Sequence, residues 1–264
     1  MKKLLLILSL MFVVTLTACS KEEKIDLKEI EERGYIIMGL DDTFAPMGFR
    51  DESNEIVGFD VDLAKELFGS AGIKLRFQPI DWAMKETELN NGNIDMIWNG
   101  YTITQERKEK VNFSTPYISS RQVIITLIDS EIDKISDLEG KVLATQTGSS
   151  SLNAITESEE LMSFVSEDEI ILFGSYNEAF IDLKARRIDA IVADEILVRY
   201  YMSSNEETEY KILDDDLGYD EFGIGLRKES TDLLELINNL LDEMKQDKRA
   251  AKISVKWFAE NIVE

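Results

Sequence analysis

Histidine is absent from this 264-residue chain, and cysteine occurs once, as Cys19. The chain therefore lacks the residues for a Ser-His-Asp triad, a Cys-His pair or a histidine-ligated zinc site, and it cannot form an internal disulfide. An enzyme built on this sequence would have to use carboxylates, lysine, tyrosine or a bound ion. No pattern of residues predicts a cofactor or a metal, and we expect neither.

Positive charge is also scarce, with 29 Lys and Arg against 52 Asp and Glu, which gives a net charge of −23. Such a surface repels phosphate backbones, so nucleic acid is excluded as a natural partner. The hydrophobic fraction of 44% over this length is enough for one large or two modest globular domains.

A long apolar run occurs only at the N-terminus, where Lys2 and Lys3 precede the apolar stretch Leu4 to Val14. This stretch is shorter than the about 20 residues of a transmembrane helix and has the form of a secretory signal. Leu16-Thr17-Ala18-Cys19 resembles a bacterial lipobox, which implies a signal peptide over residues 1–18 and a lipid on Cys19. Residues 19–29 would form a polar tether, with the folded part beginning near Ile30.

Short apolar runs alternate with amphipathic segments along the rest of the chain, which predicts an α/β fold with parallel sheets. The expected strands are Tyr35–Leu40, Leu75–Ile80, Ile94–Asn99, Val123–Ile128, Val142–Thr145, Ala190–Ala193 and Phe222–Leu226. The expected helices include Val61–Phe68, Ser149–Glu157, Tyr176–Ala185 and Asp232–Lys245. Ligands in such folds bind at the carboxyl ends of strands, so the loops that follow the strands are the candidate site.

Several ordered motifs are similar to those of the family 3 extracellular solute-binding proteins, which bind polar amino acids for ABC importers. The motifs are Asp41-Asp42-Thr43-Phe44, Gly58-Phe59-Asp60-Val61-Asp62, Gly92-Asn93-Ile94-Asp95, Gly100-Tyr101-Thr102-Ile103-Thr104-Gln105-Glu106-Arg107, Val111-Asn112-Phe113-Ser114-Thr115-Pro116-Tyr117 and Asp189-Ala190-Ile191-Val192-Ala193-Asp194. The resemblance covers nearly the whole mature chain. It implies the type II periplasmic-binding-protein fold, in which two lobes joined by two crossover strands close on a ligand. Lobe one would comprise residues 30–120 and 218–264, and lobe two residues 121–217.

The resemblance also implies a receptor for an amino-acid zwitterion. Arg107 would bind the ligand carboxylate bidentately, although the residue alone is equally a solvated arginine on a turn. Thr102 would assist, and Gly100 would let the ligand ammonium approach a backbone carbonyl. Ser149 and Ser150, at the start of a predicted helix, would receive the same carboxylate, with an ordinary helix cap as the alternative for Ser149.

At the opposite end of the ligand, Asp194 matches the amine-binding aspartate of the family, and Asp41 would hold the ammonium or a polar side chain. Phe44 and Trp82 align with the aromatic pair that encloses the ligand side chain. Gln146 stands where some relatives have lysine. Asp60 is expected to cap the helix that begins beside it, a structural role.

We therefore expect an extracytoplasmic, lipid-anchored, monomeric binding protein, not an enzyme, that delivers a polar amino acid to an ABC permease. Glutamine, a basic amino acid and cystine all remain open, whereas acidic ligands are disfavoured because Arg107 is the only cation in the matched site loops. Two other functions use the same fold: a cyclohexadienyl-dehydratase-like enzyme, with Asp41 or Glu195 as its acid, and an amino-acid sensor module.

Overall fold

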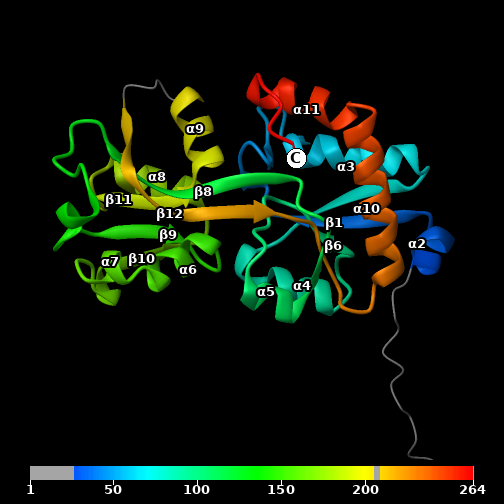
Figure 1. Cartoon of the computed structure of the whole chain (residues 1–264), viewed down its shortest axis with the longest axis horizontal. Helices are drawn as coiled ribbons and strands as arrows, with labels where there is room; N and C mark the ends of the chain where they lie inside the picture. The colour runs from blue at the N-terminus through cyan, green and yellow to red at the C-terminus, as the bar shows by residue number, and fades with distance from the viewer. Residues whose placement is uncertain (1–26, 205–208, 264) are drawn as a thin grey trace, which may run out of the picture.

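The chain folds into two lobes that lie side by side, each built on its own five-stranded sheet (Figure 1). The computed structural model describes residues 27–204 and 209–263. The predicted signal peptide, Cys19 and most of the predicted tether lie outside these residues, and the first described helix already begins at Leu27. No helix in the described residues is both long and apolar enough to span a bilayer.

The sheet of lobe one has the strand order β5-β1-β6-β13-β7, in which β1 is parallel to both neighbours and β13 is antiparallel to both of its own. Its strands are β1 (Tyr35–Leu40), β5 (Lys74–Pro79), β6 (Met96–Ile97), β7 (Asn112–Phe113) and β13 (Gly225–Leu226). The helices of this lobe are α2 (Leu27–Arg33), α3 (Phe59–Ser70), α4 (Lys85–Asn90), α5 (Gln105–Lys110), α10 (Thr231–Gln246) and α11 (Arg249–Phe258). A small antiparallel sheet is formed by β2 (Thr43–Phe44), β3 (Gly48–Arg50) and β4 (Ile56–Val57).

The sheet of lobe two has the order β10-β9-β11-β8-β12, and helices lie on both of its faces (Figure 1). Its strands are β8 (Ile118–Leu127), β9 (Leu143–Gln146), β10 (Ile170–Phe173), β11 (Ala190–Asp194) and β12 (Tyr210–Phe222). Its helices are α6 (Ser150–Glu157), α7 (Glu159–Met162), α8 (Tyr176–Lys184) and α9 (Glu195–Ser204). Short 3-10 turns occur at Trp82–Met84, Ile135–Leu138 and Glu167–Glu169.

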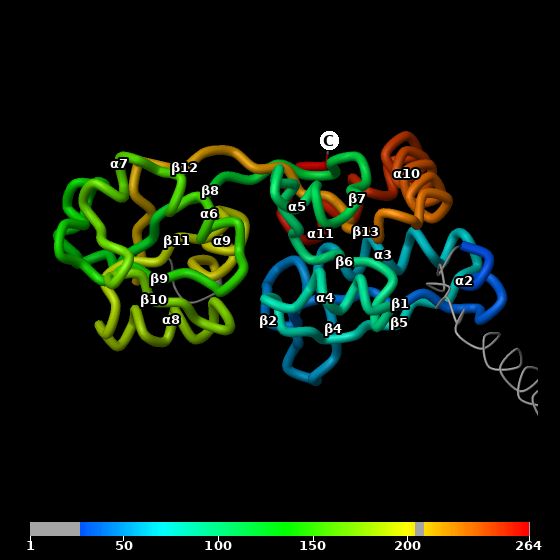
Figure 2. The backbone as a smooth tube through the Cα atoms, turned by 90° about the horizontal axis from the view of Figure 1, so that it is seen from below, coloured from blue at the N-terminus to red at the C-terminus, as the bar shows by residue number. Residues whose placement is uncertain are grey.

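Strands β8 and β12 pair with each other and run from one lobe into the other (Figure 2). The lobe boundaries that we propose at 120/121 and 217/218 fall inside these two strands. Because β8 and β12 cross in opposite directions, β8 is antiparallel to both neighbours, β11 and β12. The predicted parallel pairing is confirmed for β1 with β5 and β6 and for β9 with β10 and β11, but the antiparallel strands β8, β12 and β13 make both main sheets mixed.

Strand β12 was not expected, because its sequence Tyr210–Phe222 is rich in acidic residues and lacks alternation. It lies at the edge of its sheet, and its pairing with β8 shifts register between Ile212 and Asp216 and again before Tyr219. An edge strand with bulges is solvated on one side and need not show a period of two.

Segments with a strong hydrophobic pattern were predicted more accurately than β12. Helix α10 buries Leu233, Ile237, Leu241 and Met244, which recur at helical spacing, and β1 is an interior strand of the sheet of lobe one. The helices and loops at the carboxyl ends of the central strands are thereby held facing the other lobe.

Candidate functional site

A small cavity lies between the lobes. It is lined from lobe one by Phe44, Trp82, Gly100 and Arg107, and from lobe two by Gln146, Ser149, Ser150, Tyr176 and Asp194. Asp41 and Thr102, which belong to the predicted set, do not line the cavity. They bind residues that do, since Asp41 accepts from the Gln146 amide and the Thr102 hydroxyl bonds that of Ser150.

Arg107 is held at one end of the cavity by the helix that carries it. The Thr104 side chain caps α5 by accepting from the Arg107 backbone N–H at 3.1 Å. The guanidinium is buried, stacks 4.7 Å from the centre of the Tyr101 ring, and donates to the carbonyls of Thr102 at 2.9 Å and Gly148 at 3.1 Å. A guanidinium has five N–H donors, so donors remain for a ligand carboxylate after these two bonds.

Two serines from lobe two complete this end, at the N-terminus of α6. Ser149 Oγ accepts from the backbone N–H of Leu152 at 3.2 Å, so it is a helix cap as well as a cavity residue. Ser150 Oγ lies 2.9 Å from the Thr102 hydroxyl of the other lobe. Free N–H groups at a helix N-terminus favour an anion, which makes this end suited to a carboxylate.

Asp194 lies at the other charged end, as the last residue of β11 and almost fully buried. Its Oδ1 accepts from Nε2 of Gln122 at 2.8 Å. Burial and the nearby Asp220 carboxylate raise the pKa of Asp194 to about 7, although the Arg107 charge acts in the opposite direction. A buried aspartate without a paired cation is suited to bind a ligand ammonium.

Gly100 also lines the cavity, and a hydrogen bond to the Asp60 carboxylate fixes its position. The Gly100 backbone has φ +56, and a Cβ built there would lie 2.8 Å from Cε1 of Phe44. Its N–H donates to Asp60 Oδ2 at 2.7 Å, and the Tyr117 hydroxyl donates to the same oxygen at 3.0 Å. The expected helix cap by Asp60 is thus wrong: this carboxylate instead fixes the loop at Gly100, and burial raises its pKa to about 7.

The third region of the cavity would face a ligand side chain. Gln146 Nε2 donates to Asp41 Oδ2 at 2.6 Å and to the Gly174 carbonyl at 2.9 Å. Both amide hydrogens are therefore used, and Gln146 has its carbonyl oxygen left for a ligand. The aromatic walls include Phe44 and Tyr176, whose ring centres lie 5.9 Å apart.

Tyr176 was missed as a cavity residue, although its helix was predicted. It begins α8 after a loop that leaves the carboxyl end of β10, the sheet edge where ligands bind in such folds. That position in the sequence could have identified Tyr176 as a cavity residue. The hydroxyl of Tyr176 bonds Ser151 at 2.8 Å, and burial raises its pKa to about 12.

A second buried cation near Arg107 was also missed. Lys85 is 3% exposed, and its ammonium donates to the carbonyls of Trp82 at 3.1 Å and Gly148 at 2.9 Å. Burial first, and then the Arg107 charge, lower its pKa to about 8. Lys85 is the first residue of α4, outside the site loops, and it does not line the cavity.

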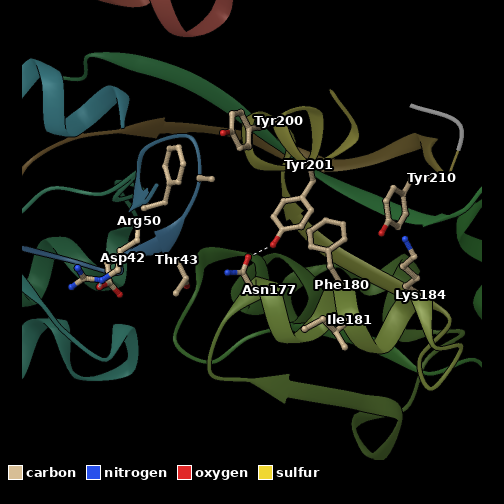
Figure 3. A pocket seen from close by; sticks show the side chains of 12 residues that line it. Asp42, Thr43, Arg50, Asn177, Phe180, Ile181, Lys184, Tyr200, Tyr201 and Tyr210 are labelled. Carbon is tan, nitrogen blue, oxygen red and sulfur yellow. Dashed lines mark hydrogen bonds and ion pairs between the residues drawn. The ribbon is translucent and has the colours of Figure 1, made fainter. Parts of the chain in front are cut away.

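A wider groove opens between the lobes outside the cavity (Figure 3). Its aromatic wall includes Phe180 and Tyr201, whose rings stack with centres 3.9 Å apart. Its charged residues are paired within each lobe, Arg50 with Asp42 at 2.6 Å and Lys184 with Glu209 at 2.8 Å. These charges are already neutralised, so the cavity between Arg107 and Asp194 is the better candidate for binding a zwitterion.

No three His, Cys, Asp or Glu side chains within 27–204 and 209–263 are grouped in a way that could hold a metal ion. The polar side-chain groups of the cavity include instead a guanidinium, three hydroxyls, one amide and a carboxylate. Their arrangement is suited to non-covalent recognition of a small molecule that carries both signs of charge.

Known proteins with similar sequences and structures bind amino acids. The chain is 30% identical to the L-cystine-binding protein TcyJ of Escherichia coli K12 over 90% of this chain and 88% of that protein. It is 31% identical to the arginine-binding extracellular protein ArtP of Bacillus subtilis over 98% of both chains. A substrate-binding protein of an ABC uptake transporter from Streptococcus pneumoniae, solved with bound histidine, is 39% identical with a TM-score of 0.87 over 89% of this chain and 97% of that one.

The family model for bacterial extracellular solute-binding proteins, family 3, matches residues 36–260. This range includes both lobes and all the residues that line the cavity. With its fold of two lobes around a polar cavity, the chain belongs to the family 3 bacterial extracellular solute-binding proteins.

Proposed function

We propose that this solute-binding protein captures a polar amino acid between its lobes and delivers it to the permease of an ABC importer. One observation carries the proposal: Arg107 of lobe one and Asp194 of lobe two line the same cavity. An amino-acid zwitterion presents a carboxylate and an ammonium to match them. The ligand undergoes no covalent change and leaves the protein intact.

Closure of the lobes around the ligand is the mechanism of capture. The hydrogen bonds from Arg107 to the Gly148 carbonyl and between the Thr102 and Ser150 hydroxyls join different lobes. These bonds form only when the lobes are together. A ligand that binds charged groups of both lobes binds the closed form more tightly, and this differential affinity shifts the population toward it. The permease recognises the closed form.

The side-chain end favours a ligand that donates hydrogen bonds. Gln146 offers an acceptor oxygen, and the buried Asp41 carboxylate lies directly behind its amide. A guanidinium, ammonium or imidazolium side chain satisfies both, and a glutamine amide satisfies the first. We therefore rank basic amino acids first, glutamine second and cystine third, and relatives that bind arginine or histidine support this order. An acidic side chain would meet acceptors only.

The protein acts as a monomer outside the cytoplasm of a bacterium, anchored to the membrane by a lipid on Cys19. The lipobox-like stretch before Cys19 supports this location. Cys19→Ser should abolish labelling by radioactive palmitate and move the protein from the membrane fraction to the soluble fraction. Retention of the label by this variant would contradict the anchor.

Thermal unfolding of the protein against all twenty amino acids and cystine tests the binding function. A ligand at 100 times its Kd adds about 2.7 kcal/mol to the free energy of unfolding, which raises Tm by several degrees. We expect the largest shifts with arginine, lysine or histidine, and mass spectrometry should recover the ligand unchanged. Protein free of co-purified ligand that shifts with none of them, or that turns over prephenate, would contradict the proposal.

A further inference from the structure

The amide of Gln122 connects the ammonium end of the cavity to the strands that join the lobes. Gln122 lies on β8, and its Nε2 donates to Asp194 at 2.8 Å and to Asp220 at 2.7 Å, with a longer contact of 3.3 Å to the Ser150 hydroxyl. Gln122 is 1% exposed, and its oxygen accepts from Ser151 at 2.6 Å. The two carboxylates are therefore held together by one buried nitrogen.

Asp220 comes from β12, the second strand that joins the lobes. The sheet order β11-β8-β12 places Asp194, Gln122 and Asp220 on three successive strands. The predicted ammonium site is thus continuous with both joining strands. Sequence reasoning did not consider Asp220, because it lies in an acidic segment that was not expected to be a strand.

The charges around this pair leave an excess of negative charge. Asp194 faces Asp220, the Arg107 guanidinium and the Tyr176 hydroxyl, and Asp220 faces Arg107 and Glu157. One guanidinium thus serves two carboxylates. Burial raises the pKa of both, and that of Asp194 reaches about 7. When a ligand carboxylate occupies Arg107, this compensation weakens further.

Nearby charges on α9 do not supply the missing cation. Glu195 accepts from Arg121 at 2.6 Å and from Arg199 at 2.8 Å, and Arg121 also pairs with Asp216 at 3.1 Å. These two arginines are therefore bound to their own carboxylates. Among the described residues, Arg107 is thus left as a cation shared by Asp194 and Asp220, and the ligand ammonium would supply a second positive charge.

We propose that Asp220 is a second carboxylate of the ammonium site, a positioning residue that acts through Gln122 on Asp194, and that the pair exchanges one proton for the ligand ammonium. The inference rests on the proposed function. In the empty site the two carboxylates share a proton. When the ammonium enters, the O–H bond of that carboxylic acid breaks and the proton passes to solvent. Both carboxylates then remain as anions, Asp194 beside the ligand cation and Asp220 behind Gln122.

Asp220→Asn tests the inference, with Glu221→Gln as the matched control. Glu221 is the next residue of β12, is exposed, and carries the same charge. Calorimetry at pH 6.5 in two buffers of different ionisation enthalpy measures the protons released when arginine, or the best ligand of the panel, binds. Wild type and Glu221→Gln should release a substantial fraction of a proton. Asp220→Asn should release less.

The pH profile of Kd gives a second measurement that a purely structural role would not move. Removing the negative charge of Asp220 lets Asp194 ionise at lower pH, so the midpoint of the profile should shift down. At pH 8, where Asp194 is ionised in either protein, Asp220→Asn should bind roughly threefold to tenfold more weakly because one attractive charge is lost. Asp220→Ala provides a second variant if the asparagine protein unfolds.

The outcomes separate this inference from the proposed function. A wild-type protein that binds no amino acid refutes the proposed function and the ligand role of Asp220 together. A wild-type protein that binds its ligand, with proton release and a pH midpoint that Asp220→Asn leaves unchanged, overturns the role of Asp220 alone. A lower midpoint for Asp194 in the carboxyl carbon NMR titration of unliganded Asp220→Asn would support the coupling directly.

Discussion

The two charged ends of the cavity are built from opposite kinds of charge. At the carboxylate end, Arg107 is a permanent cation that lobe one supplies, helped by hydroxyls and the N-terminus of α6. At the ammonium end, Asp194 is a titratable anion whose pKa is raised to about 7 by burial and by Asp220. The first end should bind with equal strength at any physiological pH, whereas the second should not. Proton coupling is therefore confined to one half of the recognition site.

Removing the permanent charge should have the largest effect. Arg107→Ala leaves the ligand carboxylate buried without its cation and should weaken binding of every amino acid by about 2–5 kcal/mol. Isothermal calorimetry measures the loss, and Lys108→Ala, an exposed lysine of the same helix, is the control. A well-folded Arg107→Ala protein with normal affinity would show that Arg107 does not bind the ligand carboxylate, and that the cavity has no end with a permanent positive charge.

The carboxylate end was largely predictable from the sequence because its residues are close together in the chain. Thr102, Thr104 and Arg107 lie within one turn and the first part of a helix, so a short motif contains the receptor and its cap. The strands β1 and β11 and the helix α10 were predictable for a similar reason, since each has a strong local pattern of burial.

The ammonium end was predictable only in part. Asp194 ends an apolar strand, and this position identified it as a candidate site residue. Its neighbours Gln122 and Asp220, however, lie 72 and 26 residues away in the sequence. Lys85 is another example. A lysine in a polar segment is expected to be exposed to solvent, but the Lys85 ammonium is covered by a contact with the Gly148 carbonyl of the other lobe. Contacts between lobes leave no local pattern, so the sequence could not predict them.

The side-chain end should differ from both charged ends by discriminating between ligands. Asp41→Asn removes the anion behind Gln146, so a basic ligand loses a charge-assisted interaction of about 1.5–3 kcal/mol while glutamine loses much less. Kd values for arginine and glutamine measure the difference. Asp42→Asn, whose carboxylate pairs with Arg50 instead, is the control. An equal loss for both ligands would exclude Asp41 from ligand selection.

The pH dependence of binding tests the titratable end directly. Protonated Asp194 cannot pair with an ammonium, and the liganded protein binds fewer protons, so affinity should rise as pH increases through about 7. Binding should be about tenfold weaker at pH 6 than at pH 8, or about 1.4 kcal/mol. Asp194→Asn should flatten this profile and bind weakly throughout. A flat profile in the wild type would show that both ends carry fixed charge.

The smallest effect should separate two roles within the carboxylate end. Ser149→Ala removes the cap on the Leu152 N–H and should lower the free energy of unfolding of the unliganded protein by about 1 kcal/mol. Ser150→Ala removes no cap but breaks the hydrogen bond to Thr102 of the other lobe, so it should weaken ligand binding while leaving unliganded stability nearly unchanged. Urea unfolding with and without ligand measures both quantities. A Ser149→Ala protein as stable as the wild type would mean that α6 does not depend on its cap.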